Sequence, residues 1–351
     1  MDLKAIYYST KTYNMNISKD MKYLSFFDKR SFIAELSTGK ILSDFKYSTN
    51  HNVSFLSDSK VVYQSFDSLF IRDFITEKKF PIIRQSAHNS FEFSKPLVYD
   101  NSVYYFFGNS KSSRKFCRWN DGKTEELFSL DTSHNPHTVI DNGICYICDF
   151  DKSNNSIVIR TYNLENSQIF DESFKLQETE GVAMAAYIPQ KDLIVAVVST
   201  KKTRKGLRVR FYRKSSFEFL FEKKEPEMRF VPIKMVLMCN GRYVVIPHAY
   251  GFYVYDTENF DDNKKINLFS PCFTISCDND NFCFVRSSID LILFTPVLSP
   301  ENEKLMSDIE QCIQNVKGTS KQSGNNQGEQ SGDGSEQSGD GSKQSGGRFY
   351  D

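Results

Sequence analysis

Short runs of alternating apolar and polar residues fill most of this chain, and turn residues separate them. Residues 21–27, 31–36 and 40–45 read MKYLSFF, SFIAEL and KILSDF, with turns between the runs. An alternation with a period of two is typical of β-strands. No segment between residues 1 and 298 shows the period of a helix. The pattern therefore predicts an all-β fold and argues against parallel βαβ architectures.

A degenerate dipeptide ends one strand in each group of runs. The second positions of successive copies lie 38 to 50 residues apart. The seven copies are Ala34-Glu35, Arg72-Asp73, Trp119-Asn120, Tyr162-Asn163, Tyr212-Arg213, Tyr255-Asp256 and Phe294-Thr295. A period of roughly 40 to 45 residues is the length of one four-stranded propeller blade. The copies predict a seven-bladed β-propeller over residues 1–298, and the uneven spacing leaves six or eight blades open if one copy is misassigned.

At these positions the chain resembles the WD40-repeat family, in which a blade carries Gly-His near its start and Trp-Asp at the end of its third strand. Two copies of the dipeptide keep the Asp and one keeps the Trp. Three histidines stand where the family places its His, namely His51, His88 and His134. The resemblance implies a structural hydrogen-bonding role for these histidines. It also implies that residues 3–9 add a strand to the last blade, and ring closure of this kind removes exposed strand edges.

After Pro300 the period changes to that of a helix. Residues 299–318 carry one apolar stripe, made of Leu305, Ile309, Ile313 and Val316, and Gly318 is expected to end the helix. Residues 319–351 are rich in Gly, Ser, Gln, Asp and Lys, with no apolar residue before Phe349. Such a composition cannot bury enough surface to offset its ordering entropy, so it predicts a disordered tail.

Composition and charge narrow the function classes. The 351 residues are 39% hydrophobic and 14% aromatic, enough for a core, and 44 basic side chains balance 44 acidic ones. The balance excludes a global field that would recruit nucleic acid or a membrane surface. The start of the chain lacks a signal-peptide pattern, no stretch reaches the length of a membrane span, and the eight cysteines mostly lie in strand-like runs. We expect a cytoplasmic or nuclear protein.

No catalytic, metal or cofactor site is predicted. The sequence lacks HExxH, GxSxG, a phosphate-binding GxxxxGK[ST] loop and GxGxxG after a strand. Cys145 and Cys148 form a CxxC, but the run ICYIC is that of a strand, which sends residues three apart to opposite faces. Cys272, Cys277 and Cys283 lack a second close pair and are expected in the core. Four acids could point into a central channel, namely Glu92, Asp100, Asp141 and Asp192. The favoured alternative is that they lie in solvated turns.

The strongest local charge lies in residues 201–214, KKTRKGLRVRFYRK, which contain eight basic residues and no acid. The candidate anion- or partner-binding residues are Lys201, Lys202, Arg204, Lys205, Arg208 and Arg210. Such a loop suits phosphates of a lipid headgroup, RNA or a phosphoprotein. The alternative is a solvated hairpin opposed by the nearby EKKEPE. The chain is also comparable to phosphoinositide-binding propellers, but it lacks their paired-arginine FRRG signature.

The tail carries a second candidate motif, Arg348, Phe349 and Tyr350, which could dock into a groove as a short linear motif. Taken together, the sequence favours a non-enzymatic scaffold that presents propeller loops to other proteins, as part of a complex. Two alternatives stay open: a binder of phosphate-rich ligands such as phosphoinositide membranes or RNA through residues 201–214, and an enzyme that uses the central channel.

Overall fold

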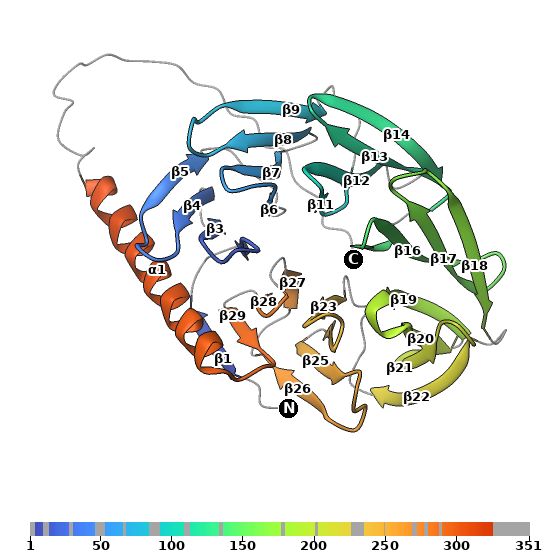
Figure 1. Cartoon of the computed structure of the whole chain (residues 1–351). Helices are drawn as coiled ribbons and strands as arrows, with labels where there is room; N and C mark the ends of the chain where they lie inside the picture. The colour runs from blue at the N-terminus through green and yellow to red at the C-terminus, as the bar shows by residue number, and fades with distance from the viewer. Residues whose placement is uncertain are drawn as a thin grey trace, which may run out of the picture.

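Antiparallel sheets form the blades of a closed ring, and the described part of the chain contains seven of them (Figure 1). The computed structural model describes residues 4–9, 14–27, 31–45, 53–65, 68–83, 92–108, 113–132, 136–176, 180–200, 203–225, 235–248, 250–268, 272–276, 280–287 and 290–325. The predicted fold class and number of blades are confirmed.

Each blade runs from an inner to an outer strand in chain order, except the last. Blade 1 holds β2 (Asn14–Ile17), β3 (Tyr23–Phe27), β4 (Ser31–Glu35) and β5 (Ile41–Phe45). Blade 2 holds β6 (Val53–Phe55), β7 (Lys60–Ser65), β8 (Ser68–Asp73) and β9 (Lys79–Ile83). Blade 3 holds β10 (Glu92–Phe93), β11 (Leu97–Tyr99), β12 (Ser102–Gly108), β13 (Arg114–Asn120) and β14 (Lys123–Leu130).

The remaining blades follow the same plan. Blade 4 holds β15 (His137–Asp141), β16 (Ile144–Asp151), β17 (Ser156–Asn163) and β18 (Ile169–Lys175). Blade 5 holds β19 (Glu180–Ile188), a short 3-10 helix η1 (Pro189–Lys191), β20 (Leu193–Thr200), β21 (Thr203–Arg213) and β22 (Glu218–Glu225). Blade 6 holds β23 (Val236–Met238), β24 (Tyr243–His248), β25 (Gly251–Asp256) and β26 (Asn263–Asn267). Blade 7 holds β27 (Cys272–Ser276), β28 (Cys283–Ser287), β29 (Asp290–Thr295) and β1 (Lys4–Ser9).

The recurring dipeptide ends the strand next to the outermost one in all seven blades, and in each four-stranded blade this is the third strand, as predicted. Its second residue often caps the turn that follows. The Asp73 carboxylate accepts the backbone N–H groups of Ile75 and Thr76 at 3.0 and 2.8 Å, and Asn163 accepts that of Glu165 at 2.9 Å. Asp, Asn and Thr side chains close turns of this kind onto the backbone two or three residues on. The repeat in the sequence is therefore a repeat of turn chemistry.

The ring closes where the first strand of the chain joins the last blade. Strand β1 pairs antiparallel with β29, from Lys4 opposite Thr295 to Ser9 opposite Asp290. This confirms the predicted closing strand. Between the blades, apolar side chains fill each seam, by which we mean the interface of two neighbouring blades; Val62 of blade 2, for example, shares a buried cluster with Tyr105 of blade 3.

Helix α1 (Pro300–Asn325) covers the seam between blades 7 and 1 (Figure 1). Among its described side chains, the buried apolar ones are Met306, Ile309, Cys312, Ile313 and Val316. They share one cluster with Leu24 and Phe26 of blade 1 and Leu293 of blade 7. The Ser299 hydroxyl accepts the backbone N–H of Asn302 at 3.2 Å, which caps the start of the helix.

Two details of the predicted helix differ. Leu305 is only partly buried, and Met306 and Cys312 widen the apolar stripe because two blades contact the helix from two sides. The helix also continues beyond Gly318 to Asn325, since extending a docked helix avoids the cost of nucleation. The predicted tail from residue 326 onward lies outside the described residues.

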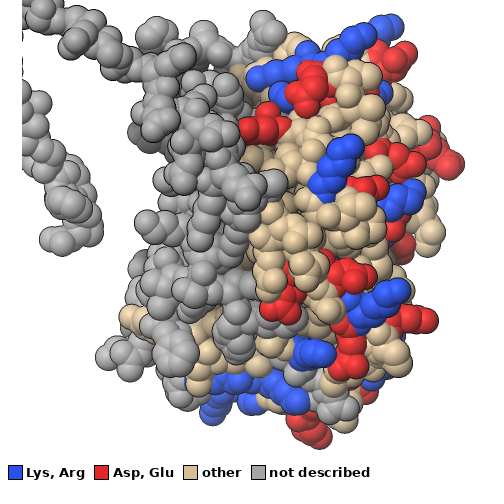
Figure 2. Space-filling model, turned by 90° about the vertical axis from the view of Figure 1, so that its left-hand side faces the viewer, with Lys and Arg blue, Asp and Glu red and all other residues tan. Residues whose placement is uncertain are grey.

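The edge of the disc along which α1 runs carries both signs of charge. Figure 2 shows Lys and Arg interspersed with Asp and Glu over the described residues, and neither sign forms a large field there. Among these residues, no helix combines the length and apolarity that crossing a membrane requires.

Replacing Ile313 by Ala is expected to lower the free energy of unfolding by about 2–5 kcal/mol, because this side chain of α1 is fully buried against blades 1 and 7. Urea unfolding followed by circular dichroism measures the change. The matched control is Gln314→Ala, one residue on and exposed, which should shift stability by less than about 0.5 kcal/mol. Equal effects of the two substitutions would show that α1 does not seal the seam.

Candidate functional site

The outer part of the seam between blades 4 and 5 exposes large apolar side chains. Phe170 on β18 is 59% exposed and Phe219 on β22 is 54% exposed. Phe170 and Phe174 share one face of β18, and Phe174 pairs with Ile157, which packs in the cluster between these blades. Phe219 pairs with Tyr212 of the same cluster. Both exposed rings therefore belong to the same seam, which we call the 4/5 seam.

A row of aromatic rings crosses this seam beneath the exposed pair. Phe174 of blade 4 lies 4.8 Å from the Tyr212 ring of blade 5 and stacks on Phe217 at 5.3 Å between ring centroids. Tyr212 in turn meets Phe219 edge-on at 5.9 Å. Aromatic pairs in these arrangements add about 0.5–1.5 kcal/mol each beyond their buried area. The row joins two blades and holds Phe219 in position.

The turn that carries Phe217 is strained. Phe217 has a φ of 52°, a left-handed conformation that a bulky side chain rarely adopts. Such a conformation costs on the order of 1–3 kcal/mol and persists where surrounding contacts enforce it. The stacking on Phe174, an ion pair between Lys214 and Glu172, and a hydrogen bond from the Ser215 N–H to the Asp192 carboxylate at 3.2 Å hold the turn against blade 4 and η1. Strain of this kind marks the seam as a candidate site.

Two of the six predicted anion-binding residues have described side chains, and both meet an acid. The Glu222 carboxylate accepts a hydrogen bond from Arg210 Nε at 2.7 Å and lies 3.5 Å from Arg208 Nη1. Arg210 and Tyr212 share a face of β21, with 3.4 Å between the guanidinium and the phenol oxygen. Partial burial raises the pKa of Glu222, but the hydrogen bond and charge of Arg210 outweigh it and lower the pKa below its usual range.

The other four predicted residues are less well defined. Lys201 and Lys202 lie outside the described residues. Arg204 and Lys205 belong to β21, and nothing is described of their side chains. The structure therefore brings together only Arg208 and Arg210, with Glu222 between them. The tail residues Arg348, Phe349 and Tyr350 also lie outside the described part of the chain.

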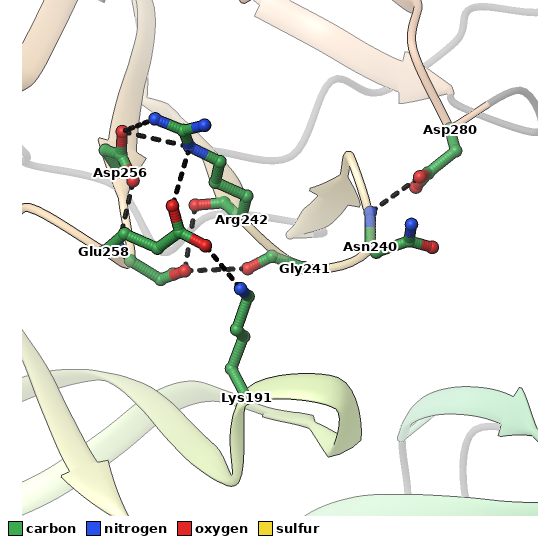
Figure 3. Close-up of polar contacts among 8 residues, drawn as sticks. Lys191, Asn240, Gly241, Arg242, Asp256, Glu258 and Asp280 are labelled. Atoms are coloured by element: carbon green, nitrogen blue, oxygen red, sulfur yellow. Dashed lines mark hydrogen bonds and ion pairs between the residues drawn. The ribbon is translucent and has the colours of Figure 1, made fainter.

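A polar cluster joins blades 5 and 6 near the end of β25 (Figure 3). Lys191 of η1 pairs with Glu258 at 2.5 Å. Arg242 contacts the same Glu258 at 3.3 Å and Asp256 at 3.2 Å. Asp256, the second residue of a recurring dipeptide, also accepts the Glu258 N–H at 2.9 Å. Because these charges satisfy one another, the cluster is a clamp between blades.

The adjoining turn extends the clamp to blade 7. The Asn240 N–H donates to the Asp280 carboxylate at 2.6 Å (Figure 3). Residues 239–241 all have positive φ, and a Cβ on Gly241 would lie 2.2 Å from Cγ2 of Ile188 in blade 5. Only glycine allows this close approach. The turn is thus built for contact between three successive blades.

The cysteines behave as core residues. Cys145 and Cys148 lie on the strand β16, as predicted, and pack in different clusters on its two faces. Burial raises the pKa of both thiols. Cys283 is buried as well, Cys277 lies outside the described residues, and Cys272 belongs to β27. In the described part of the chain, no three His, Cys, Asp or Glu side chains gather in a group that could hold a metal ion.

The four candidate channel acids lie in different strands and turns of blades 3, 4 and 5. His51, His88 and His134 lie outside the described residues. Asp100 and Asp192 lie in turns with φ values of 46° and 53°, which favours their interpretation as turn acids. Glu92 and Asp141 lie in β10 and at the end of β15.

Sequence reasoning missed the exposed aromatic residues of the 4/5 seam. Phe170 and Phe219 each occupy the second position of an outermost strand, where polar residues face solvent in β14. The sequence signal for these exposed residues was a Phe at the second position of the strand that follows the dipeptide. This signal can be recognised only once that strand is known to be the outermost one of its blade.

Glu222→Gln is expected to lower the free energy of unfolding at pH 7 by roughly 1–3 kcal/mol, because it removes the charge from the hydrogen bond with Arg210. The pKa of Glu222 is lowered on folding, so its stabilisation is present above the unfolded-state pKa and is lost as the pH falls through the folded-state value. The difference between wild type and variant should therefore close below about pH 4.

Chemical unfolding at a series of pH values measures this difference. The control is Glu125→Gln, which breaks the ion pair of an acid that is 57% exposed and should cost less than about 1 kcal/mol. If the Glu222 difference stayed constant down to pH 3, the ion pair would not be the source of the stabilisation.

Comparisons with known proteins agree on the fold. No protein-family model and no curated protein sequence matches the chain. Among solved structures, Hsv2 of Kluyveromyces lactis is similar, with 12% identity, a TM-score of 0.55 and coverage of 80% of this chain and 91% of that one. A form of that protein whose loop 6CD is replaced by a Gly-Ser linker matches with 13% identity, a TM-score of 0.54 and coverage of 80% and 90%. At this identity the likeness shows architecture alone: the chain is a seven-bladed, WD40-like β-propeller.

Proposed function

We propose that this chain is a non-enzymatic scaffold that binds another protein at the 4/5 seam. The observation that carries the proposal is that Phe170 and Phe219 are both more than half exposed. They occupy the same second position on the outer strands of neighbouring blades, and an aromatic row joins these blades. Exposed aromatic side chains on a rigid support are typical of protein interfaces, where they bury large areas at little cost in conformational entropy. A propeller supplies that rigidity because every blade is held by its neighbours.

The geometry favours an extended segment as the bound part of the partner. Strands β18 and β22 are the last in their sheets, so among the described residues no strand pairs with their outer edges. An added strand would pair with such an edge through backbone hydrogen bonds, and apolar side chains at alternate positions would meet the exposed rings. Arg213, 48% exposed, and Glu218, 63% exposed, flank the patch and supply a polar rim.

The phosphate-binding alternative ranks below this proposal. A phosphate ligand would compete with Glu222 for Arg208 and Arg210, and that acid already accepts the shorter contact at 2.7 Å. Displacing a partly buried carboxylate from an arginine costs the hydrogen bond it makes. The proposal therefore places the specific contact on aromatic side chains, with the basic residues of β21 as accessory charge.

The test is affinity purification of the full chain from its own cells beside the double variant Phe170→Ser/Phe219→Ser. Recovery of the bound protein should fall at least ten-fold, because truncating central aromatic residues typically costs about 2 kcal/mol or more of binding free energy. The matched control is Tyr250→Ser, which removes a ring that is 55% exposed on blade 6 and should leave recovery unchanged. Thermal unfolding confirms that both variants are folded.

Two results would contradict the proposal. Equal recovery by the wild type and the double variant would remove the 4/5 seam from binding. A partner lost only when Lys201, Lys202, Arg204 and Lys205 are replaced by Ser, with strong dependence on salt, would favour the phosphate-binding alternative.

A further inference from the structure

A second exposed apolar patch lies on blade 2, away from the 4/5 seam. Ile75, in the turn after β8, is 60% exposed, and Phe80 on β9 is 46% exposed. We propose that Phe349 and Tyr350 of this same chain dock on this patch, so that the tail folds back onto the propeller. The patch and the ligand both differ from those of the proposed partner site.

Phe80 lies over the seam between blades 2 and 3. It pairs with Ile71, and paired residues on neighbouring strands project to the same side of the sheet. Ile71 belongs to the buried cluster between blades 2 and 3, against which Trp119 of blade 3 packs. The Thr124 hydroxyl donates to the Ile82 carbonyl at 3.2 Å, which ties β14 of blade 3 to β9. Phe80 thus extends toward solvent the apolar seam against which Trp119 packs.

The tail offers only one apolar element that could cover this patch. Residues 319–348 contain no hydrophobic or aromatic residue, and Phe349 and Tyr350 follow directly. Burying an aromatic side chain stabilises by about 1.5–3 kcal/mol. Every other part of the tail can contribute polar contacts alone. The aromatic pair is therefore the part of the tail expected to bind an apolar surface.

The length of the tail suits blade 2. Helix α1 ends at Asn325, and in Figure 1 its end lies outside blade 1, nearer to blade 2 than to β18 and β22, which lie across the ring. The 24 residues from there to Phe349 can span at most about 80 Å. For the Gly- and Ser-rich sequence a root-mean-square span of about 27 Å is expected. Tethering at that range raises the local concentration of the motif to roughly millimolar, most strongly for the nearest patch.

The distance from the end of α1 decides which of the two exposed patches the tail is expected to bind. The 4/5 seam has the larger aromatic surface, but reaching it requires the tail to cross the ring. The effective concentration falls steeply once the distance exceeds the preferred span of the tether. Self-docking on blade 2 leaves the 4/5 seam available to a partner while it covers the remaining apolar patch near the tail.

The full-length double variant Phe349→Ala/Tyr350→Ala serves as the receptor, since its own tail cannot occupy the patch. A fluorescein-labelled peptide of residues 340–351 is added, and fluorescence anisotropy measures its binding. We expect saturable binding that weakens at least ten-fold when Phe349 and Tyr350 of the peptide are replaced by Ala. Adding Phe80→Ser to the receptor should weaken it to the same extent, while Phe219→Ser, the matched exposed aromatic residue of the 4/5 seam, should leave it unchanged.

Trp119 supplies a second readout, because it is the only Trp in the chain and packs against the cluster of Ile71, the residue that pairs with Phe80. Quenching of its fluorescence by acrylamide should be at least 1.5-fold stronger in the full-length double variant than in the wild type. Identical quenching together with no peptide binding at 1 mM (roughly the effective concentration of the tether) would overturn the proposal. Binding that is abolished by Phe219→Ser and kept by Phe80→Ser would also overturn it, since the tail would then occupy the 4/5 seam.

Discussion

Closure of the ring is the constraint on which the rest of this structure depends. Strand β1, from one end of the propeller sequence, completes the sheet of β29 from the other end, and six residue pairs form the ladder. Helix α1 then covers the adjoining seam, and Lys4 of β1 pairs with Glu303 of α1 at 3.0 Å. Because each blade packs only on its neighbours, an open seam would expose the cluster around Leu24 and Leu293 and two strand edges. The ring and the helix therefore stabilise one another.

Within the closed ring, the turns after the dipeptides are held by side chains. A side-chain oxygen of the dipeptide's second residue accepts backbone N–H groups of the next turn in several blades, as Asp73 and Asp256 do. In blade 6 the same position also recruits Arg242 and, through Glu258, Lys191 of blade 5. Asp256 thus serves both the local turn and, through Arg242 and Glu258, the packing of blade 6 on blade 5.

The rim of the disc, formed by the outer strands, is where aromatic side chains are exposed. Inner and middle strands are covered on both faces by adjacent blades, so the described aromatic residues on them are buried or partly buried. The outer strands have an open edge, and an aromatic residue there can stay half in solvent, as Phe170, Phe219 and Phe80 do. Nearby charges are paired, with Glu222 between two arginines and Glu172 against Lys214. The surface chemistry available for recognition is therefore mainly aromatic, with polar groups at its margin.

Local pattern alone was sufficient for the repeat, the strands that end at the dipeptide and the position of the helix, because alternation and turn chemistry depend only on neighbours along the chain. The closing strand was expected from the resemblance to the WD40-repeat family. Local pattern was not sufficient for the 4/5 seam. Whether Phe170 is buried depends on its strand being outermost in a sheet, and whether Arg208 and Arg210 are available depends on Glu222 facing them from β22. The width of the stripe on α1 likewise depends on two blades meeting the helix, which buried Met306 and Cys312 beside the predicted Ile309. These properties arise from contacts between segments distant in sequence, and only tertiary packing decides them.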